Sequence, residues 1–477
     1  MIDGSKVNSP SFRVLSEEQC ERIHRATLKV LETVGVKVEL PEGREILRKA
    51  GATVEGEIVK IPKGLVEEAL KKAPSSFTVW DRLGNEALEL GGRRSHFGGC
   101  ASCPQILDPR TGERRPCTRA DVAEFARMND YLPNMEFIML LGQVRDVPSL
   151  IATQVEFKET VSNTVKPILM CCNEMDVFED VYEMLVAISG GADALAERPF
   201  LIVYTEPITP LVHGYGLEVA LRSVERGLPV VNTPMPMGGA TAPVTYAGII
   251  TLGTAESVSG IVMQQLVKPG APSVFGGIPS AMDMLTTIYS YGTPELPLLC
   301  SALTDMSHYY DLPMFGTAGV SDSKFLDAQA GMEYGISALA SVMCGSNLIH
   351  DTGFLDHSEV LSFEGHLLMD ELAGYIRQFM KGVEVSDETL ALDIIGRVGP
   401  GGTFVAEEHT FRHFRELHRT KHLDRSRYQL AQMEGMKPLD QVLREKACEI
   451  LESHRPAPLA AGVQSRLDQM EKKWWAR

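Results

Sequence analysis

Three common signatures of ligand binding and catalysis are missing from this sequence. No G-x-G-x-x-G opens a helix after the first predicted strand, and no G-x-x-x-x-G-K-[ST] is present, so the glycine loops that hold nucleotide phosphates are lacking. There is also no G-x-S-x-G, the motif that presents the serine of many hydrolases. These absences argue against a dinucleotide-binding enzyme of the usual type, a P-loop NTPase and a Ser-His-Asp hydrolase.

Positive charge is scarce as well. The 477 residues include 46 Lys and Arg against 63 Asp and Glu, a formal net charge of -17. Because proteins bind nucleic acid through clustered cations, we expect no nucleic-acid partner. No apolar segment follows the charged start of the chain, so no signal peptide is expected. The most apolar predicted helix, Ala247–Val267, contains Glu256, which favours a buried barrel helix over a membrane span. We therefore expect a cytoplasmic protein without a membrane partner.

Cysteine is sparse, with nine residues in the chain, and the cytosol would keep this odd set of thiols reduced. Cys100 and Cys103 have C-x-x-C spacing and Cys117 lies nearby, but no second pair with matching spacing is present. A zinc or redox site needs further ligands, usually with histidine among them. Packed thiols are the simpler interpretation, and we predict no metal site. A zinc-dependent enzyme that uses the Cys100 and Cys103 thiols is the alternative.

What the sequence does contain is a series of eight short apolar segments, nearly all of which end in polar residues or glycine. Helix-patterned stretches separate them, and they recur roughly every 30–45 residues, the length of a βα unit. Eight such units predict an α/β fold, a closed TIM-type (β/α)8 barrel. The predicted strands are Ser95–Ala101, Met135–Gln143, Val165–Asn173, Phe200–Glu206, Leu228–Thr233, Ser273–Ile278, Met314–Ala318 and Asn347–Asp351.

The rest of the chain divides around this barrel. Residues 1–94 are predicted to form an α+β cap segment packed on the barrel, residues 95–384 the barrel, and residues 385–477 a helical C-terminal extension. Ser16 is expected to cap the first helix, with Gln19 three residues later. Thr118 is expected to cap the helix that leads to the second barrel strand.

The carboxyl ends of the strands are where a barrel of this kind places its active site. Among the residues at these ends we single out His350, which lies beside Asp351 and shortly before Gly353 and Phe354. A histidine there is suited to anchor a carboxylate or to act as an acid or base. A hydrogen-bonded core histidine is the plainer alternative, and Asp351 is expected either to orient it or to face the helix layer.

The C-terminal extension contains a cluster of basic residues, although the chain as a whole is acidic. Residues 409–427 contain six Arg or Lys and four His. A solvated helical face is the simple interpretation, and a docking surface or lid over the barrel mouth is the functional one. His409 and His413 have the spacing of one helix face, but without an HExxH glutamate or a third ligand we predict no metal binding.

At the strand ends the chain resembles the trimethylamine methyltransferase family. The resemblance covers nearly the whole chain and recurs at several barrel positions in the same order. The matching stretches are Val30-Leu-Glu-Thr-Val-Gly35, Asn232-Thr-Pro-Met-Pro-Met-Gly-Gly239, Gly319-Val-Ser-Asp-Ser-Lys324 with Asp327-Ala-Gln-Ala-Gly331, and His350-Asp-Thr-Gly353.

This resemblance implies an enzyme that moves a methyl group from an amine to the Co(I) of a corrinoid (cobalamin) carried by a separate partner protein, with no cofactor bound permanently. Trimethylamine enzymes of methanogens carry pyrrolysine near the seventh strand, whereas this chain has ordinary residues through Gly316–Lys324. It is therefore similar to the non-pyrrolysine branch, which acts on quaternary amines. We expect glycine betaine as substrate and dimethylglycine as product, with carnitine, proline betaine, choline and γ-butyrobetaine left open.

The chemistry of that branch suggests roles for the strand-end residues. A quaternary ammonium leaves as a neutral amine, so we predict no catalytic acid, only groups that bind and orient the substrate. The expected aromatic cage with its counter-charge is Tyr204, Phe97, Phe315 and Phe354 with Glu206, and the expected carboxylate donors are His350, Asn232, Gln143 and Arg145. The tail cations expected to receive the corrinoid protein are Arg412, Arg415 and Arg419. A homo-oligomer is expected, and a non-catalytic quaternary-amine binder is the second alternative.

Overall fold

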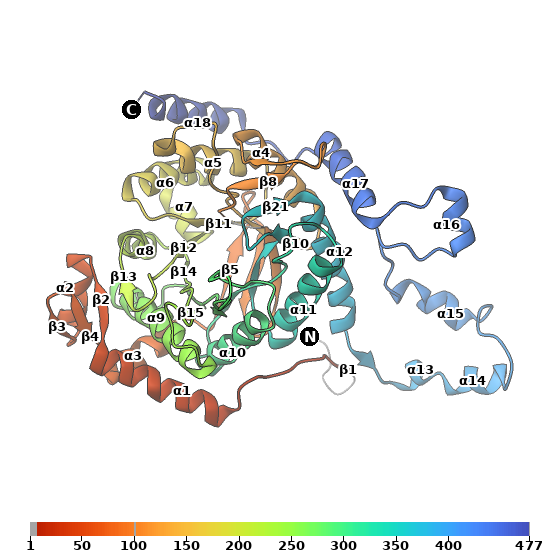
Figure 1. Ribbon diagram of the computed structural model, residues 1–477, viewed down its shortest axis with the longest axis horizontal. Coiled ribbons are helices and arrows are strands. Elements are labelled where there is room, and N and C mark those ends of the chain that lie inside the picture. The colour runs from red at the N-terminus through yellow and green to blue at the C-terminus, as the bar shows by residue number, and fades with distance from the viewer. Residues whose placement is uncertain (1–6, 100–101, 477) are drawn as a thin grey trace.

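The fold is a closed barrel of eight parallel strands, seen in a computed structural model that describes residues 7–99 and 102–476 (Figure 1). Around the barrel the strands follow the order β10, β11, β12, β14, β16, β18, β19, β7. Seven of the predicted segments contain one of these strands and the eighth overlaps β19, which ends one residue later at Thr352, so the predicted TIM-type barrel is confirmed. The strands are β7 (His96–Gly99), β10 (Met135–Met139), β11 (Ile168–Cys171), β12 (Leu201–Thr205), β14 (Val230–Asn232), β16 (Ser273–Gly276), β18 (Met314–Thr317) and β19 (Leu348–Thr352).

Helices surround the barrel. The longest, α9, is apolar enough to cross a membrane by length and composition, but 72% of its most apolar stretch is buried in the protein. Its Glu256 accepts hydrogen bonds from the Leu211 backbone N–H and the Thr209 hydroxyl, which satisfies the buried carboxylate. Thr118 caps α4 through a capping box, as predicted. The barrel helices are α4 (Arg119–Tyr131), α5 (Ala152–Ser162), α6 (Met175–Ser189), α7 (Ala192–Glu197), α8 (Gly216–Glu225), α9 (Tyr246–Val267), α10 (Glu295–Tyr309), α11 (Ala328–Cys344) and α12 (Phe363–Met380).

The N-terminal segment is an α+β layer that packs on barrel helices. Ser16 and Gln19 form the predicted capping box at its first helix. Residues 53–60 form a hairpin, because Gly56 adopts a φ of +66° and reverses the chain. Apolar side chains of this segment share one core with α9 and α10. Its elements are α1 (Glu17–Lys29), a π-helical turn (Val30–Val34), β2 (Val36–Val38), α2 (Pro41–Lys49), β3 (Thr53–Glu55), β4 (Ile58–Lys60) and α3 (Lys63–Lys72), with β13 (Val212–His213) added to the sheet.

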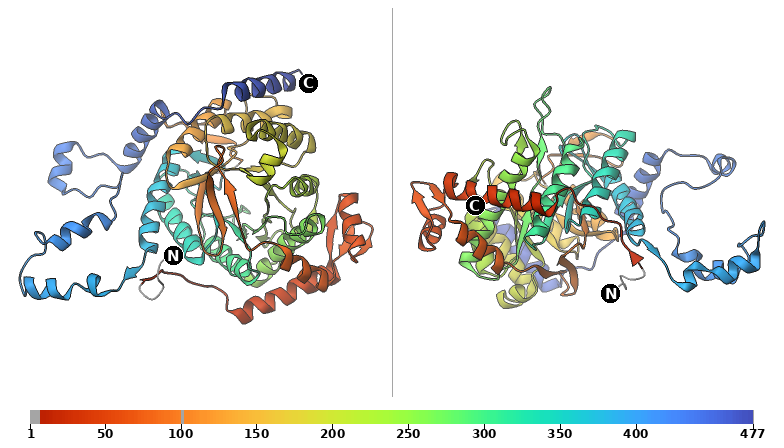
Figure 2. Two further views of the ribbon diagram at one scale, coloured as in Figure 1. Left: turned by 180° about the vertical axis from the view of Figure 1, so that it is seen from behind. Right: turned by 90° about the horizontal axis from the view of Figure 1, so that it is seen from below.

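A second hairpin, β5 (Ser76–Trp80) and β6 (Glu86–Gly91), closes the bottom of the barrel. Its Val79, Leu88 and Leu90 belong to the same buried cluster as the side chains that fill the barrel interior. The strand ends opposite this hairpin are therefore the open end of the barrel. Figure 2 shows the barrel from behind, with the strands at its centre and helices around them.

The C-terminal extension is mostly helical, as predicted, and part of it projects away from the barrel (Figures 1 and 2). β22 (Val383–Glu384) pairs with β1 (Val7–Asn8) at the base of this projection. The helices that follow are α13 (Asp387–Leu390), α14 (Leu392–Val398), α15 (Glu408–His413), α16 (Tyr428–Glu434), α17 (Leu439–Ser453) and α18 (Ala461–Trp474). α17 returns to pack on α12 and α4, and α18 packs on α5 and α6.

Short strands complete the rim of the open end. β20 (Phe354–Leu355) and β21 (Val360–Ser362) form a hairpin directly after β19, and they join β8 (Gln105–Leu107) and β9 (Arg114–Pro116) in one sheet. β15 (Met237–Gly238) pairs with β17 (Ser280–Ala281). These pairs hold the loops after the barrel strands in place, which is where the candidate site lies.

Candidate functional site at the barrel mouth

A cavity of about 160 Å³ lies at the open end of the barrel. Pockets for drug-sized ligands are about 300–1,000 Å³, so this cavity is sized for a smaller molecule. Its walls come from the ends of β10, β11, β12 and β19 and from the loops beyond them. The lining residues are Ser102, Met139, Cys171, Tyr204, Glu206, Met235, Ile278, Tyr291, His350, Asp351, Phe354 and Ser358. We call it the mouth cavity.

Strained backbone occurs at three neighbouring strand ends at the open end of the barrel. Ser102 follows β7 with a φ of 57°, Gln143 follows β10 with 53°, and Asp351 in β19 has 72°. Non-glycine residues in this left-handed region cost about 1–3 kcal/mol each and concentrate at functional sites. The strain at Asp351 has a direct consequence. It turns a side chain that strand alternation would point toward the helices into the mouth cavity.

Tyr204 and Glu206 form the first polar pair of the cavity. The Tyr204 hydroxyl donates to Glu206 Oε1 at 2.6 Å. Glu206 is reached through the cavity, yet protein surrounds it closely enough that desolvation raises the pKa of its carboxyl, and the charge of Asp351 raises it further. The buried Tyr204 has a pKa well above its usual value for the same reason. Tyr204 is therefore a hydrogen-bond donor that holds Glu206 in place.

His350 and Asp351 form the second pair. His350 Nδ1 lies 2.8 Å from the Gly316 carbonyl oxygen, so this nitrogen carries a proton and donates it. Its Nε2 lies 3.2 Å from Asp351 Oδ1, and Asp351 Oδ2 accepts from the Thr317 hydroxyl at 2.7 Å. Burial raises the pKa of Asp351, and the neighbouring His350 opposes that rise. A substrate carboxylate placed on Nε2 would meet the Asp351 carboxylate, so the predicted role of His350 as a carboxylate anchor does not fit this geometry.

Four of the predicted site residues thus line one cavity: Tyr204, Glu206, His350 and Phe354. Phe315 lies beneath them and is fully buried, with its ring centroid 4.3 Å from that of His350 and 5.4 Å from that of Tyr204. It is the floor under the cavity and not part of its wall, which corrects the prediction that Phe315 belongs to the cage.

Phe97 and Asn232 face away from the cavity. Phe97 packs in the core between the barrel and its helices, because its neighbour Gly98 occupies the inward position and leaves room for the Phe137 ring there. Asn232 Oδ1 accepts from Gln264 on α9 at 2.9 Å, while Val231 fills the inward position of β14. Neither Phe97 nor Asn232 is therefore on the wall of the mouth cavity.

Gln143 and Arg145 line a second cavity of about 340 Å³ next to the first. The two cavities share wall residues, which are Ser102, Met139 and Cys171. Arg145 Nη2 donates to Gln143 Oε1 at 3.1 Å, so the two predicted donors lie together. The buried Glu156 accepts from the Val144 backbone N–H at 3.0 Å and fixes this loop, and burial raises its pKa to about 7.

Sequence reasoning missed two polar wall residues. Tyr291 lies in the long loop between β16 and α10, and Ser358 lies in the turn of the β20–β21 hairpin. Burial raises the pKa of Tyr291, which keeps its hydroxyl protonated. The aromatic pair Tyr289 and Tyr291 in a long loop after a barrel strand was the available signal.

Of the two cysteines in the C-x-x-C motif, Cys100 lies outside the described residues, so the structure describes Cys103 alone. Cys103 is buried, its thiol lies 2.8 Å from the Gln105 carbonyl oxygen, and burial raises its pKa to about 12. Within residues 7–99 and 102–476, no group of three His, Cys, Asp or Glu side chains is placed to hold a metal ion.

The three predicted docking arginines lie in the C-terminal projection. Arg412 lies 3.5 Å from Glu388, and the Arg415 guanidinium lies 5.5 Å from the Phe414 ring centroid. Arg419 follows in the segment that returns toward α12. None of the three lines the mouth cavity or the second cavity beside it.

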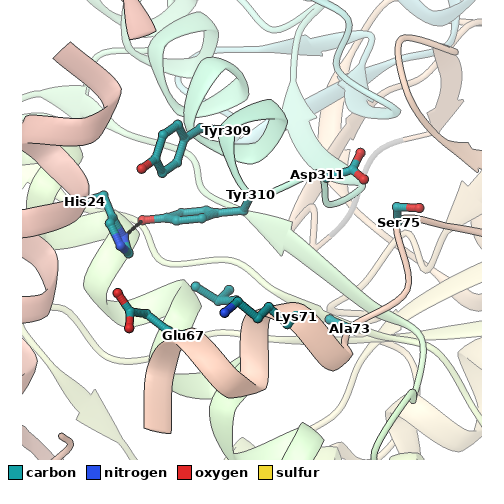
Figure 3. Close-up of a pocket in the computed structure, with 9 residues that line it drawn as sticks. His24, Glu67, Lys71, Ala73, Ser75, Tyr309, Tyr310 and Asp311 are labelled. Atoms are coloured by element: carbon teal, nitrogen blue, oxygen red, sulfur yellow. Dashed lines mark hydrogen bonds between the residues drawn. The ribbon is translucent and has the colours of Figure 1, made fainter. Parts of the chain in front are cut away.

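A further cavity, of about 600 Å³, lies at the other end of the barrel. Figure 3 shows it between the N-terminal helices and the end of α10, with the Tyr310 hydroxyl 3.1 Å from His24 Nδ1. Glu67 and Lys71 point into it from α3. Because Tyr310 and its neighbours precede β18, this cavity borders the amino ends of the strands, where barrels of this fold do not place catalysis.

Comparison with known proteins gives consistent matches. A family model described as trimethylamine methyltransferase matches residues 3–474. A trimethylamine methyltransferase of Desulfitobacterium hafniense is 34% identical over 466 residues, 96% of this chain and 94% of its own. A glycine betaine methyltransferase of the same species is 31% identical over 423 residues, 88% of each chain. Among solved structures, dihydropteroate synthase from Stenotrophomonas maltophilia has a TM-score of 0.35 at 12% identity, covering 60% of this chain and 93% of its own.

Proposed function

The chain belongs to the trimethylamine methyltransferase family, and we propose that this member takes a methyl group from a small quaternary amine, with glycine betaine as the favoured substrate. The acceptor is the Co(I) ion of a corrinoid held by a separate protein. The cobalt electron pair attacks the methyl carbon, the C–N bond breaks, and its electron pair stays on nitrogen, so dimethylglycine leaves as a neutral amine. Positioning of one N-methyl group toward the acceptor is then the main task of the site.

The observation that carries this proposal is the acidic and aromatic wall of the mouth cavity. Two carboxylates, Glu206 and Asp351, line it, and neither Lys nor Arg does. Burial raises the pKa of both carboxyls, and the charge of Asp351 raises the pKa of Glu206 further, so a bound cation would relieve the repulsion between them. The aromatic rings of Tyr204, Tyr291 and Phe354 add cation–π contacts of about 0.5–2 kcal/mol each. A permanently charged ammonium is the ligand that such a wall favours.

The second cavity supports the choice of a betaine. A substrate with its ammonium in the mouth cavity would direct its carboxylate toward the shared wall, on the side where Arg145 and Gln143 lie. A guanidinium has five N–H donors, so the hydrogen bond to Gln143 leaves donors for a carboxylate. Arg145 is then the group that binds the carboxylate, and His350 supports Asp351.

Exposed apolar side chains on the rim support docking of a partner over the mouth. They follow five different barrel strands, and Leu285 is 93% exposed. Clustered apolar residues on a surface mark interaction sites. The rim residues are Leu150 after β10, Tyr215 after β12, Val244 after β14, Leu285 after β16 and Phe325 after β18.

A single-turnover assay tests the proposal. Free Co(I) cobalamin replaces the partner protein, and methyl-cobalamin and the demethylated amine are measured for glycine betaine, choline, carnitine, proline betaine, γ-butyrobetaine and trimethylamine. We expect transfer from glycine betaine with dimethylglycine formed in equal amount. Transfer from trimethylamine alone would overturn the substrate class, and calorimetric binding without transfer from any amine would leave a non-catalytic binder. Stoichiometric zinc in the purified protein would favour the thiol-dependent alternative.

A further inference from the structure

The projecting part of the C-terminal extension, residues 385–415, which we call the arm, carries an apolar surface that this chain leaves uncovered. Among described residues 383–438, Ile394 alone is buried. Hydrogen bonds and ion pairs of the arm, within the part of the chain described, join its residues to one another or to residues 384, 416 and 417. Its exposed large apolar side chains are Val385, Leu390, Leu392, Ile395, Phe404, Val405, Phe411 and Phe414.

Such a segment does not stabilise itself. Short helices without a packed face are marginal in water, and contiguous exposed apolar patches on soluble proteins mark interfaces. Figure 1 shows the arm reaching away from the barrel as a chain of short helices. Its base is fixed on both sides, by the pairing of β22 with β1 and by contacts of residues 416–422 with α12. The arm is therefore held in an extended position from which it meets another surface.

A second uncovered apolar surface lies on α11. A helix on the outside of a barrel normally has a charged outer face. Glu333 is the single charged residue among the 17 residues of α11. Its carboxylate accepts hydrogen bonds from the Ser321 hydroxyl, the Asp322 backbone N–H and the Gln329 side-chain amide. The outer face instead shows Met332 and Ile336, 58% and 56% exposed, with open space above glycines 331 and 335. We call these four positions the α11 face.

The arm and the α11 face belong to one side of the molecule. The Phe12 backbone N–H donates to the Met343 carbonyl near the end of α11, and the same N-terminal segment continues to β1, which pairs with β22 at the base of the arm. A second copy related by a two-fold axis beside this segment would present its α11 face to the arm of the first. Isologous contacts of this kind are the commonest route to dimers.

Charge restricts where a second copy can make contact. Two chains of formal charge -17 repel each other over most of their surfaces. Contact is easiest where charge is low, and α11 with its single engaged glutamate is such a place. Permanent interfaces between copies are also more apolar than transient ones, which fits eight large apolar side chains on one arm. We propose that the arm of one copy packs on the α11 face of a second copy, so that the protein is a dimer with exchanged arms. This inference does not depend on the proposed reaction.

Sedimentation of the full-length protein tests the exchange. We expect a dimer, or an oligomer built from it, at micromolar concentration. Met332→Glu with Ile336→Glu on the face, and separately Val405→Glu with Phe411→Glu on the arm, should each raise the dissociation constant at least about 100-fold, which corresponds to about 2.7 kcal/mol. Leu83→Glu, equally exposed at 55% in the turn between β5 and β6, is the matched control and should leave the oligomer intact.

Cross-linking identifies the surfaces without relying on disruption. Ile336→Cys and Phe411→Cys are prepared as separate variants, mixed, and treated with a short bis-maleimide. We expect a covalent dimer in the mixture beyond the level that either variant or the unmodified protein gives alone. A monomeric wild type, a dimer that all four charged substitutions leave unchanged, or a mixture that does not cross-link would overturn the proposal. Arm amides that become protected from hydrogen exchange only when a corrinoid-carrying protein is added would also overturn it.

Discussion

Glu206 is the carboxylate that the amine would meet in the mouth cavity, and replacing it by Gln removes the charge while keeping the shape. The amide oxygen still accepts from Tyr204, so the wall stays in place. Two unit charges about 4 Å apart attract by about 4 kcal/mol at an effective dielectric constant of about 20. Cavity water screens Glu206 and its raised pKa reduces the ionised fraction, so we expect a loss of about 1.5–3 kcal/mol. This loss corresponds to a dissociation constant about 10- to 150-fold higher.

Calorimetric titration of wild type and Glu206→Gln with glycine betaine measures this difference. A carbon isostere of the substrate, in which a tert-butyl group replaces the trimethylammonium group, separates charge from shape. We expect both proteins to bind the isostere equally. Glu295→Gln is the control variant, because Glu295 pairs with Tyr246 on the rim and lines neither mouth cavity.

The pH dependence of the same titrations gives an independent test. Burial raises the pKa of Glu206, so lowering the pH through that raised value protonates the carboxyl and removes its charge. The amine affinity of the wild type should therefore fall as the pH falls, and the Gln variant should lack the Glu206 part of that fall. Equal affinity of both proteins for the amine would refute the reasoning, as would an equal loss for the amine and its isostere.

Three further substitutions have defined outcomes. His350→Gln removes the charge that lowers the pKa of Asp351, so amine binding measured by titration should be lost at a higher pH than in the wild type. Gly260→Ala places a Cβ 2.2 Å from Asn232 Oδ1 and should lower the free energy of unfolding by about 1–3 kcal/mol in thermal melts, whereas Gly462→Ala, with open space around it, should not. Charge reversal of the tail arginines should slow methylation of a corrinoid protein at low salt and less so at high salt, and a salt-independent rate would remove them from docking. The reversed residues are Arg412, Arg415 and Arg419.

The strands and many side-chain directions were predictable because burial on both faces leaves a strong pattern. Each barrel strand is a short apolar run, and the alternation of side chains in β19 puts Leu348 and His350 on one face, where both point inward. Alternation in β14 also predicts that Asn232 points toward the helices, because its neighbour Val231 points into the barrel. Asp351 could not be placed by alternation, because its φ of 72° breaks the period of two.

Contributions from long loops and from the tail were harder to predict for a different reason. Tyr291 and Ser358 reach the cavity from loops whose course depends on contacts distant in sequence, and no local pattern encodes such contacts. In the tail, composition predicted helices correctly. It did not predict that the arm would leave the barrel, because a helix pattern records which face is apolar and not what covers that face.

The hairpin at the bottom of the barrel limits where this chain can be cut. Val79, Leu88 and Leu90 precede every barrel strand in sequence, yet they complete the packing inside the barrel. During synthesis the hairpin emerges before the eight barrel strands, so its apolar side chains are present when the strands assemble. A fragment that begins at residue 95 would form its ring around an empty, water-accessible base and lose several fully buried apolar contacts. Transplanting the catalytic barrel, or permuting its termini, therefore requires carrying the hairpin along.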